Sequence, residues 1–521
     1  MRRRSVLGLV WLLALALPPA ASASPLLTLR DDGRVSVRED PYLPADIALA
    51  GTRAGADRHR PGAAPAAATS RPLTAMAAAR RRTVSSELKR MLDARAIDRA
   101  TYDARLATLA SARRLQRRLS GARRAALGAV LANLDAIAAR GDLTVSRLPA
   151  LFETVARNRE WWARGPLLAP GRRVSFQGSR IVWQLYPGEG LQIQWLGTFG
   201  KANALWKSRT HDADLRRLLD EAIALAAQRA GGAAFEYLFD FGGGRPPWVS
   251  GLAQGTGIQA LSRGAIRLSE PRYFDAARSG LGVFRAPPPS GVRVTTPAGA
   301  HYLIYSFSPG LRVLNGFTQA LNGLHDFALL ANDAEGRALF TAGEAQLRAE
   351  LPAYDTGAWT RYSLRSDADL SYHKLARDFL VNLCTRLKDD AARAAAPATG
   401  GTAPAAAPLA DATPYCAAGE RFSSYLRRPP VVALTSRRAR AGKPATLRFS
   451  LSKPSFVKLA VVRSGRTVAV MSARLSGGRR ALVWARPRAG SGYVVMLRAT
   501  DLAGNVGSAK GELVVLEARR K

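Results

Sequence analysis

The 521-residue sequence predicts a multidomain α+β protein that is mainly α-helical and ends in an all-β domain. Three observations support this prediction. The length suits two or three domains better than one. Apolar residues recur with a helical period in several segments between residues 83 and 388. Beyond residue 428 the apolar period changes to two, which is typical of β-strands.

Residues 1–23 have the pattern of a secretory signal peptide. Three arginines follow Met1, an apolar run extends from Val6 to Leu17, and residues 21–23 form an A-x-A cleavage site. No later stretch approaches about 18 uncharged apolar residues, so we predict no stable membrane insertion after cleavage. We expect a secreted or cell-envelope protein that can exist as a monomer, although the sequence leaves its oligomeric state open.

Residues 24–82 are rich in Ala, Pro, Gly and Arg and show no sustained periodicity, so we predict a disordered or low-complexity segment. Residues 83–165 form a predicted N-terminal helical region. Its longest apolar stripe ends at Arg140-Gly141 and consists of Leu127, Val130, Leu131, Leu134 and Ile137. Arg-studded amphipathic helices of this kind bind membranes or partners in some proteins, but we expect these helices to cover the neighbouring domain.

Residues 166–388 are predicted to form one large helical domain. Short aromatic runs around glycine turns come first, and a helix begins at Asp212 that Gly231-Gly232 is expected to end. An aromatic loop over residues 236–248 then leads into another helix. The repeated order of aromatic loop and helix indicates helical hairpins arranged in a ring, with the loops on one rim.

Residues 389–427 contain mostly small residues and proline and are predicted to be a linker. Residues 428–521 contain seven short apolar runs separated by Gly, Ser and Pro turns. Seven such strands indicate an immunoglobulin-like sandwich. The segment from Asp501 to Asn505 resembles the final turn of bacterial immunoglobulin-like modules attached to secreted enzymes. We expect this module to fold independently and see no catalytic pattern in it.

The formal net charge of +38 favours an acidic ligand, because a positive field concentrates anions. We expect an acidic polysaccharide and no nucleic acid, since an exported chain rarely meets nucleic acid and no recognised binding motif occurs. The alternative is that joint enrichment in Ala and Arg reflects a GC-rich coding sequence.

Cys384 and Cys416 are the two cysteines of the chain. An even number of cysteines in an exported protein permits a disulfide. This bridge would tie the far end of the linker to the preceding domain, with Cα atoms within about 7 Å. Two unrelated free thiols are the alternative.

Other sequence motifs are weak. The five histidines lack metal-ligand spacing, so no metal site is predicted. Gly255 and Gly257 imitate a dinucleotide-binding fingerprint, but they lie in a helical pattern with no strand before them. His325-Asp326 is predicted to be a polar helix face rather than a pair of ligands.

The most specific motifs lie between residues 302 and 373. They are Val313-Leu-Asn-Gly-Phe317, Leu351-Pro-Ala-Tyr-Asp-Thr-Gly357, Arg361-Tyr-Ser-Leu-Arg365 and Tyr372-His373. This pattern resembles the C-terminal domain of the D-glucuronyl C5-epimerases, which invert the C5 centre of uronic acids in heparan-type polysaccharides. The resemblance covers about residues 183–383. It implies an incomplete α/α toroid and a uronate-containing polysaccharide substrate, with no cofactor.

The resemblance also implies roles for six residues, which are the catalytic Tyr305, Tyr362 and Tyr372 and the substrate-binding Arg365, Asn315 and His373. Inversion at C5 needs a base on one face of the sugar, a proton donor on the other and stabilisation of the enolate charge. Tyrosine has a pKa of about 10 and becomes an effective acid or base when a guanidinium lowers that value. The structural alternative for each tyrosine is an ordinary core aromatic.

Two departures from the family pattern keep other functions open. The family has a glutamate immediately before the first tyrosine, where this chain has Ile304, and the interval between Tyr362 and Tyr372 is shorter. Glu189 and Glu236 are candidates to replace the missing carboxylate. The rival functions are a polysaccharide lyase, which shares the C5 deprotonation, and an inactive glycan-binding protein of the cell envelope.

Overall fold

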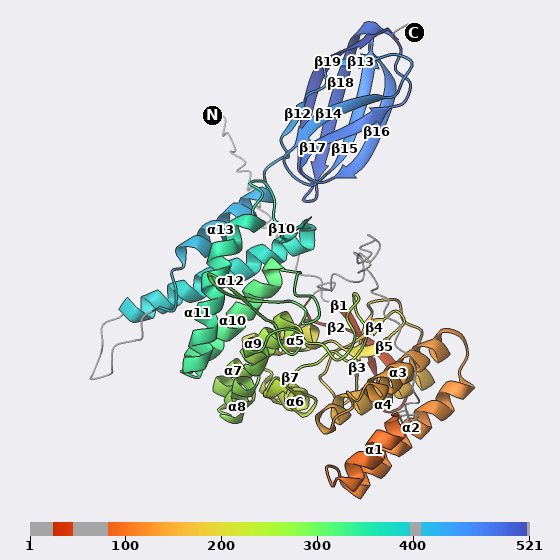
Figure 1. Ribbon diagram of the computed structural model, residues 1–521, viewed down its shortest axis with the longest axis vertical. Coiled ribbons are helices and arrows are strands. Elements are labelled where there is room, and N and C mark those ends of the chain that lie inside the picture. Colours follow the sequence, from red (N-terminus) through yellow and green to blue (C-terminus); the bar gives the residue numbers. More distant parts are fainter. Residues whose placement is uncertain (1–23, 45–81, 396–407, 518–521) are drawn as a thin grey trace, which may run out of the picture.

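The structure is a computed structural model that describes residues 24–44, 82–395 and 408–517. The predicted signal peptide lies outside these ranges, as do parts of the predicted disordered segment and of the predicted linker. Within the described ranges, no helix is both long and apolar enough to cross a membrane. The structure has an α-rich N-terminal and central part and a β-rich C-terminal part (Figure 1).

The N-terminal helical region is present as predicted. Its helices are α1 (Val84–Asp93), α2 (Arg99–Arg118), α3 (Gly121–Ala139) and α4 (Leu148–Arg164). Thr83 and Ser86 form a capping box at the start of α1, and the predicted apolar stripe of α3 is buried. These helices share one continuous hydrophobic core with the central domain, so they cover it as expected.

A five-stranded sheet joins the N-terminus to the central domain. Its order is β2 (Val35–Asp40), β1 (Ser24–Leu29), β3 (Arg173–Phe176), β4 (Trp183–Tyr186) and β5 (Gly190–Ile193). The prediction of disorder for residues 24–82 is therefore wrong for the first two strands. β1 pairs in parallel with β3, placing Leu27 opposite Val174. β1 also forms a hairpin with β2, but its buried residues, Leu26 and Leu29, do not alternate along the strand, so the pattern typical of a strand is missing.

The central domain contains most of the helices. They are α5 (Trp195–Ser208), α6 (Asp212–Ala224), α7 (Gly251–Leu268), α8 (Arg272–Ser279), α9 (Gly282–Arg285), α10 (Leu314–Leu330), α11 (Ala334–Glu350) and α12 (Leu370–Ala395). α7 and α10 pack closely, because a Cβ added to Gly255 would lie 2.7 Å from the Cα atom of Ala320. Gly255 therefore serves helix packing, which agrees with rejecting a dinucleotide fingerprint. α6 ends before Gly231, which instead turns the hairpin of β6 (Ala227–Arg229) and β7 (Gly232–Ala234).

The linker prediction for residues 389–427 is wrong at both ends. α12 continues to Ala395, and α13 (Thr413–Tyr425) packs into the main core. The expected disulfide between Cys384 and Cys416 joins these two helices, with a Cα–Cα distance of 5.0 Å. Because residues 389–427 contain mostly small residues and proline, the sequence did not indicate α13. The buried residues of this helix are Tyr415, Ala418, Gly419, Phe422 and Tyr425.

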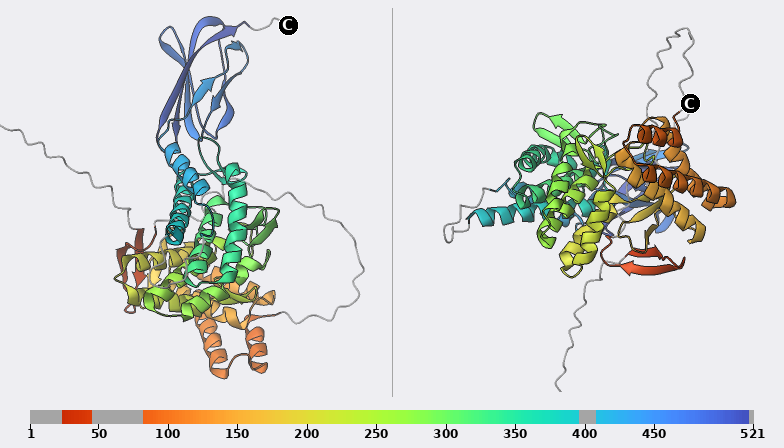
Figure 2. Two further views of the ribbon diagram at one scale, coloured as in Figure 1. Left: turned by 90° about the vertical axis from the view of Figure 1, so that its left-hand side faces the viewer. Right: turned by 90° about the horizontal axis from the view of Figure 1, so that it is seen from below.

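The C-terminal domain has two sheets that enclose a core of their own. One sheet contains β12 (Val432–Leu434), β14 (Ala445–Leu451) and β17 (Gly478–Trp484). The other has the order β13 (Arg438–Arg440), β19 (Val506–Leu516), β18 (Gly490–Asp501), β15 (Ser455–Arg463) and β16 (Arg466–Leu475). The seven predicted strands are all present and β13 is additional. The domain projects from the helical body beside α13 (Figures 1 and 2). Its immunoglobulin-like class stays a prediction.

Candidate active site

Three separate elements bring the predicted catalytic tyrosines together. Tyr305 lies in the loop after β9 (Gly299–Tyr302), Tyr362 in β10 (Arg361–Ser363) and Tyr372 in the first turn of α12. A bridge between Val313 and Ser363 holds β10 against the start of α10. The rings of Tyr362 and Tyr372 lie 4.7 Å apart. Both phenols are close enough to Tyr305 to act on its pKa electrostatically.

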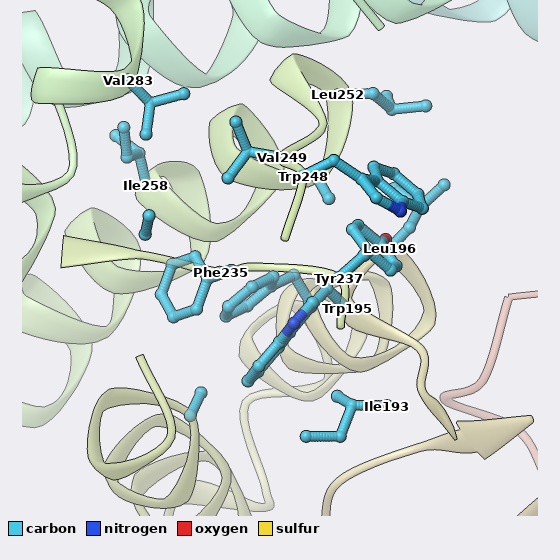
Figure 3. Close-up of a cluster of buried hydrophobic side chains, with 14 of the residues drawn as sticks. Ile193, Trp195, Leu196, Phe235, Tyr237, Trp248, Val249, Leu252, Ile258 and Val283 are labelled. Atoms are coloured by element: carbon cyan, nitrogen blue, oxygen red, sulfur yellow. The ribbon is translucent and has the colours of Figure 1, made fainter. Parts of the chain in front are cut away.

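An aromatic wall surrounds Tyr305. Its ring stacks on Phe307 with centroids 5.3 Å apart, and it meets Phe241 and Trp248 edge-on at 5.7 and 5.6 Å. Trp248 in turn stacks on Tyr237 at 4.3 Å, within the buried cluster of Figure 3. Tyr305 is only 5% exposed.

Two further tyrosines, Tyr186 and Tyr237, lie near enough to raise the pKa of Tyr305. The sequence motifs did not indicate that these two residues belong to the site. Their positions in aromatic runs beside glycine turns were the signal available in the sequence.

Burial determines the protonation state of the tyrosine cluster. Loss of solvation raises the pKa of Tyr305, Tyr362 and Tyr372 well above the ordinary value. The expectation that a guanidinium lowers these values is wrong in the ligand-free protein. The hydroxyls of Tyr305 and Tyr362 are buried and have no hydrogen-bond partner among the described residues. At neutral pH the cluster therefore presents proton donors rather than bases.

Asn315 supplies a further unused donor. It lies in the first turn of α10, is 2% exposed, and its Nδ2 has no partner within the described part of the chain. Ile304 packs against the neighbouring Gly316, because a Cβ added there would lie 3.2 Å from the Ile304 side chain. The buried amide is thus beside the position where the family has a glutamate. This placement agrees with a sugar-binding role, which stays a prediction.

Arg365 follows Tyr362 by three residues in the chain. It occupies the turn between β10 and β11 (Ser366–Asp367), and its side chain is exposed. Its guanidinium forms no ion pair with any described residue, so it is free to meet an anionic ligand. Binding of the substrate carboxylate by Arg365 remains a prediction.

His373 is a structural residue rather than a substrate ligand, which corrects the sequence interpretation. It is fully buried and stacks on Trp359 at 3.9 Å. Its Nδ1 lies 2.8 Å from the Thr360 hydroxyl, and its Nε2 lies 3.0 Å from the Phe422 carbonyl oxygen. Burial lowers its pKa to about 4, so the ring is neutral at pH 7, with Nε2 donating and Nδ1 accepting. Both ring nitrogens are therefore already engaged.

Glu236 and Glu189, the candidates to replace the family's glutamate, differ in their burial and in their ion pairs. Glu236 is buried and forms ion pairs with Arg147 and Arg229, which makes it a structural anion. Glu189 is half-buried in the turn between β4 and β5. Desolvation and the nearby charge of Asp240 raise its pKa to about 7, a value suited to a general base.

Glu189 is connected to the tyrosine cluster through the aromatic wall. β4 ends in Tyr186, whose ring lies 6.2 Å from Phe241, and Phe241 also contacts Tyr305. Asp240 directly precedes Phe241 in the chain. Of the two carboxylates, Glu189 is therefore the one available for chemistry beside this wall.

Side-chain hydrogen bonds connect the Leu351–Gly357 motif to α13. Asp355 accepts hydrogen bonds from Arg421 at 3.0 Å and from the Tyr425 hydroxyl at 2.8 Å, both on α13. Lys453 of the C-terminal domain is 1% exposed and donates to the carbonyl oxygens of Tyr425 and Arg428. The motif, α13 and the β-domain therefore form one connected support.

Lys453 is also paired with Asp501 at 3.0 Å, and this carboxylate is fully buried. A buried charge of this kind requires its partner, because an unpaired ion is costly to desolvate. This ion pair lies within the β-domain, and Lys453 connects it to the helical body through the Tyr425 carbonyl oxygen.

The His325-Asp326 pair is buried, so its prediction as a polar helix face is wrong. Asp326 forms ion pairs with Arg263 and Arg386, and His325 Nε2 lies 2.8 Å from Asp390. The network borders an open depression of about 670 Å³ at the C-terminal ends of α7 and α10. All its members have partners, which indicates a structural role between the three helices.

Comparison with known proteins identifies the class of the central region. Residues 231–395 match the family described as D-glucuronyl C5-epimerase C-terminus. A D-glucuronyl C5-epimerase from Caenorhabditis elegans is 35% identical over 145 residues, covering 25% of this chain and 24% of that protein. The chain therefore spans about a quarter of the length of this relative. The resemblance to the C-terminal epimerase domain is confirmed for this part of the chain.

Similarity to solved structures is weaker. An unsaturated glucuronyl hydrolase specific for heparin has a TM-score of 0.31 and 14% identity, covering 45% of this chain and 61% of that one. A second unsaturated glucuronyl hydrolase, from Bacillus sp. GL1, has a TM-score of 0.30 and 12% identity, covering 44% and 60%. Scores this low carry no argument, so the incomplete α/α toroid stays a prediction.

Proposed function

We propose that the protein is an exported epimerase that inverts C5 of uronic acid residues in an acidic polysaccharide. The observation that carries this proposal is the convergence of Tyr305, Tyr362 and Tyr372 from three separate elements within an epimerase-like domain. The buried hydroxyls of Tyr305 and Tyr362 offer protons to a carbanion, as reprotonation at C5 requires.

The proposed reaction needs no change of oxidation state and no cofactor. Glu189 removes the C5 proton, and the electron pair of the broken C–H bond moves into the C5–C6 bond and the carboxylate oxygens. Asn315 Nδ2 and Arg365 stabilise the resulting charge on those oxygens. The Tyr305 hydroxyl then donates its proton to the opposite face of C5. Solvent exchange returns a proton to Tyr305 and removes one from Glu189.

A second candidate is a glycan-binding protein without turnover. The specific observation in its favour is Ile304, an aliphatic side chain packed at the position of the family's glutamate. A lyase is the third function that shares the C5 deprotonation, and it differs in expelling the 4-substituent.

Incubation with the glucuronate polymer heparosan in deuterated water separates the three functions. Deuterium at C5 in an uncleaved polymer is expected for the epimerase. Cleavage with an unsaturated product that absorbs in the ultraviolet would identify a lyase. Binding without exchange or cleavage would overturn the epimerase proposal and support the glycan-binding function.

A further inference from the structure

One face of the C-terminal domain carries four cationic side chains on four neighbouring strands. Alternate residues of these strands point into the core, and the residues between them point to solvent. The outward cationic residues of β16, β15, β18 and β19 are Arg474, Lys458, Arg498 and Lys510, and all four are exposed. We call these residues the basic diagonal.

Strand register fixes the geometry of the basic diagonal. Lys458 lies directly opposite Arg498. Arg474 is one outward row to one side, opposite Phe456, and Lys510 is one row to the other side, opposite Met496. Strands lie about 4.8 Å apart and outward rows about 6.8 Å apart, so the four charges cross the sheet over about 20 Å.

This arrangement costs stability in the free protein. Like charges directly opposite each other on a sheet repel, as Lys458 and Arg498 do. None of the four side chains has an ion-pair partner within the part of the chain that the structure describes. Glu512 is the one outward-facing acid on these four strands, and it lies opposite Val494 at one end. An external anion would relieve the repulsion.

Exposed apolar side chains lie between the charges. Phe456 is 47%, Met496 50% and Val470 53% exposed, and all three belong to the same outward face. Apolar surface surrounded by charged groups marks interaction sites more often than ordinary surface. A face with both properties suits an extended polymer that has regularly spaced carboxylates and apolar C–H surfaces on its sugar rings.

We infer that the basic diagonal is a second, non-catalytic binding site for an acidic polysaccharide. The identity of the polymer rests on the proposed function. The β-domain is attached beside α13 and β10, on the side of the helical body that carries Tyr362 (Figure 1). A polymer held on the sheet therefore has a raised effective concentration at the tyrosine cluster.

The test compares two double variants of the full-length protein with equal charge change. Lys458→Gln/Arg498→Gln removes the centre of the basic diagonal. Arg448→Gln/Arg479→Gln is the matched control, because both arginines are exposed on β14 and β17 of the other sheet. Affinity for heparosan is measured at low and at physiological salt. We expect about a tenfold loss for the first variant and less than a twofold loss for the control.

Equal losses in both variants would show that net charge alone attracts the polymer and would overturn the inference. Loss of binding to phosphatidylglycerol vesicles with unchanged heparosan binding would assign the face to membranes and overturn it as well. Thermal unfolding of the Lys458→Gln/Arg498→Gln variant is expected at or above the parent temperature, because the repulsion is removed.

Exchange at C5 in a short uronate oligosaccharide separates this inference from the proposed function. The oligosaccharide is too short to occupy both sites, so the basic-diagonal variant should exchange it at the parental rate. A parent that binds heparosan through the diagonal but catalyses no exchange would refute the epimerase proposal alone.

Discussion

Lys453 of the β-domain lies against Trp359 of the helical body, with its Nζ 5.5 Å from the centre of the indole ring. Trp359 stacks on His373, and His373 directly follows Tyr372 in the chain. A buried cation of one domain therefore contacts the residues that position a tyrosine of the other. The β-domain is part of the support of the candidate site, even though it has a core of its own.

Replacing Lys453 with methionine should weaken the contact between the β-domain and the residues that position Tyr372. Asp501 would keep its charge in a fully buried position without its cation. Removal of one partner from a buried pair typically costs about 3–5 kcal/mol. Chemical denaturation should show this loss in the free energy of unfolding, together with a lower C5 exchange rate. Lys443→Met, at an exposed position of the same domain, is the control and should change stability by less than about 0.5 kcal/mol.

Tyr305→Phe should separate catalysis from stability. Loss of a general acid lowers rates by about 10²- to 10⁴-fold, so C5 exchange should fall by that factor. The free energy of unfolding should stay level or increase by about 1 kcal/mol, because the lost hydroxyl is buried without a partner. Tyr362→Phe is expected to behave in the same way.

Tyr302→Phe is the matched control for these variants. Its hydroxyl donates to the Leu339 carbonyl oxygen at 2.6 Å, so its loss should cost about 1 kcal/mol of stability. Exchange at C5 should be unaffected. If Tyr305→Phe and Tyr302→Phe showed the same pattern, the cluster would be ordinary core packing.

Local patterns in the sequence predicted the elements well where apolar residues recur with a regular period. The α3 stripe and the seven C-terminal strands follow from periodicity alone. Prediction failed for β1, although it forms a hairpin with β2, because its buried residues Leu26 and Leu29 do not alternate, and for α13, whose Ala and Pro content resembles a linker. Both depend on tertiary contacts that local composition does not report.

The site shows the same division. The sequence motifs predicted the three clustered tyrosines, because each tyrosine lies in or near a motif that resembles the family pattern. Three-dimensional packing decided that His373 is fully hydrogen-bonded, that Glu236 is ion-paired and that burial raises the tyrosine pKa values. Desolvation depends on the whole surrounding structure, so a sequence motif does not show whether the pKa of a particular side chain is raised or lowered.

The rate of C5 exchange should depend on pH through the ionisation of the Glu189 carboxyl group. The carboxylate must be ionised to accept the C5 proton, and its pKa is raised to about 7. The rate should therefore rise with pH and level off above about pH 7, falling about tenfold per unit well below it. Asp240→Asn removes one cause of the raised pKa and should move the midpoint to lower pH. A profile that is unchanged in this variant, or in Glu189→Gln, would exclude Glu189 as the base.

Removing the disulfide should loosen α13. The bridge joins cysteines 32 residues apart, and closing such a loop contributes about 3–4 kcal/mol in the chain-entropy estimate. Cys384→Ser/Cys416→Ser should lose about that much stability. Mass spectrometry of unreduced peptides should find the bridge in exported parent protein. Two free thiols there would contradict the structure.

Ile304→Glu should raise C5 exchange if the missing carboxylate is the main defect of this site. The new side chain would lie against Gly316 in the first turn of α10, where no side chain caps the helix. Free backbone N–H groups and the helix dipole favour a negative charge at this end. The unpaired Nδ2 of Asn315 is a further donor.

These donors should let the protein tolerate the buried carboxylate, and they make a direct test of its role practical. Ile304→Gln is the control, since it has nearly the same shape and hydrogen-bonding capacity but cannot accept a proton from carbon. We expect exchange to increase by about tenfold or more in Ile304→Glu and to stay at the parental rate in Ile304→Gln. Equal rates in the two variants would mean that position 304 supplies no base here. In that event Glu189, beside the aromatic wall, would stay the proposed acceptor of the C5 proton in the variant as it is in the parent.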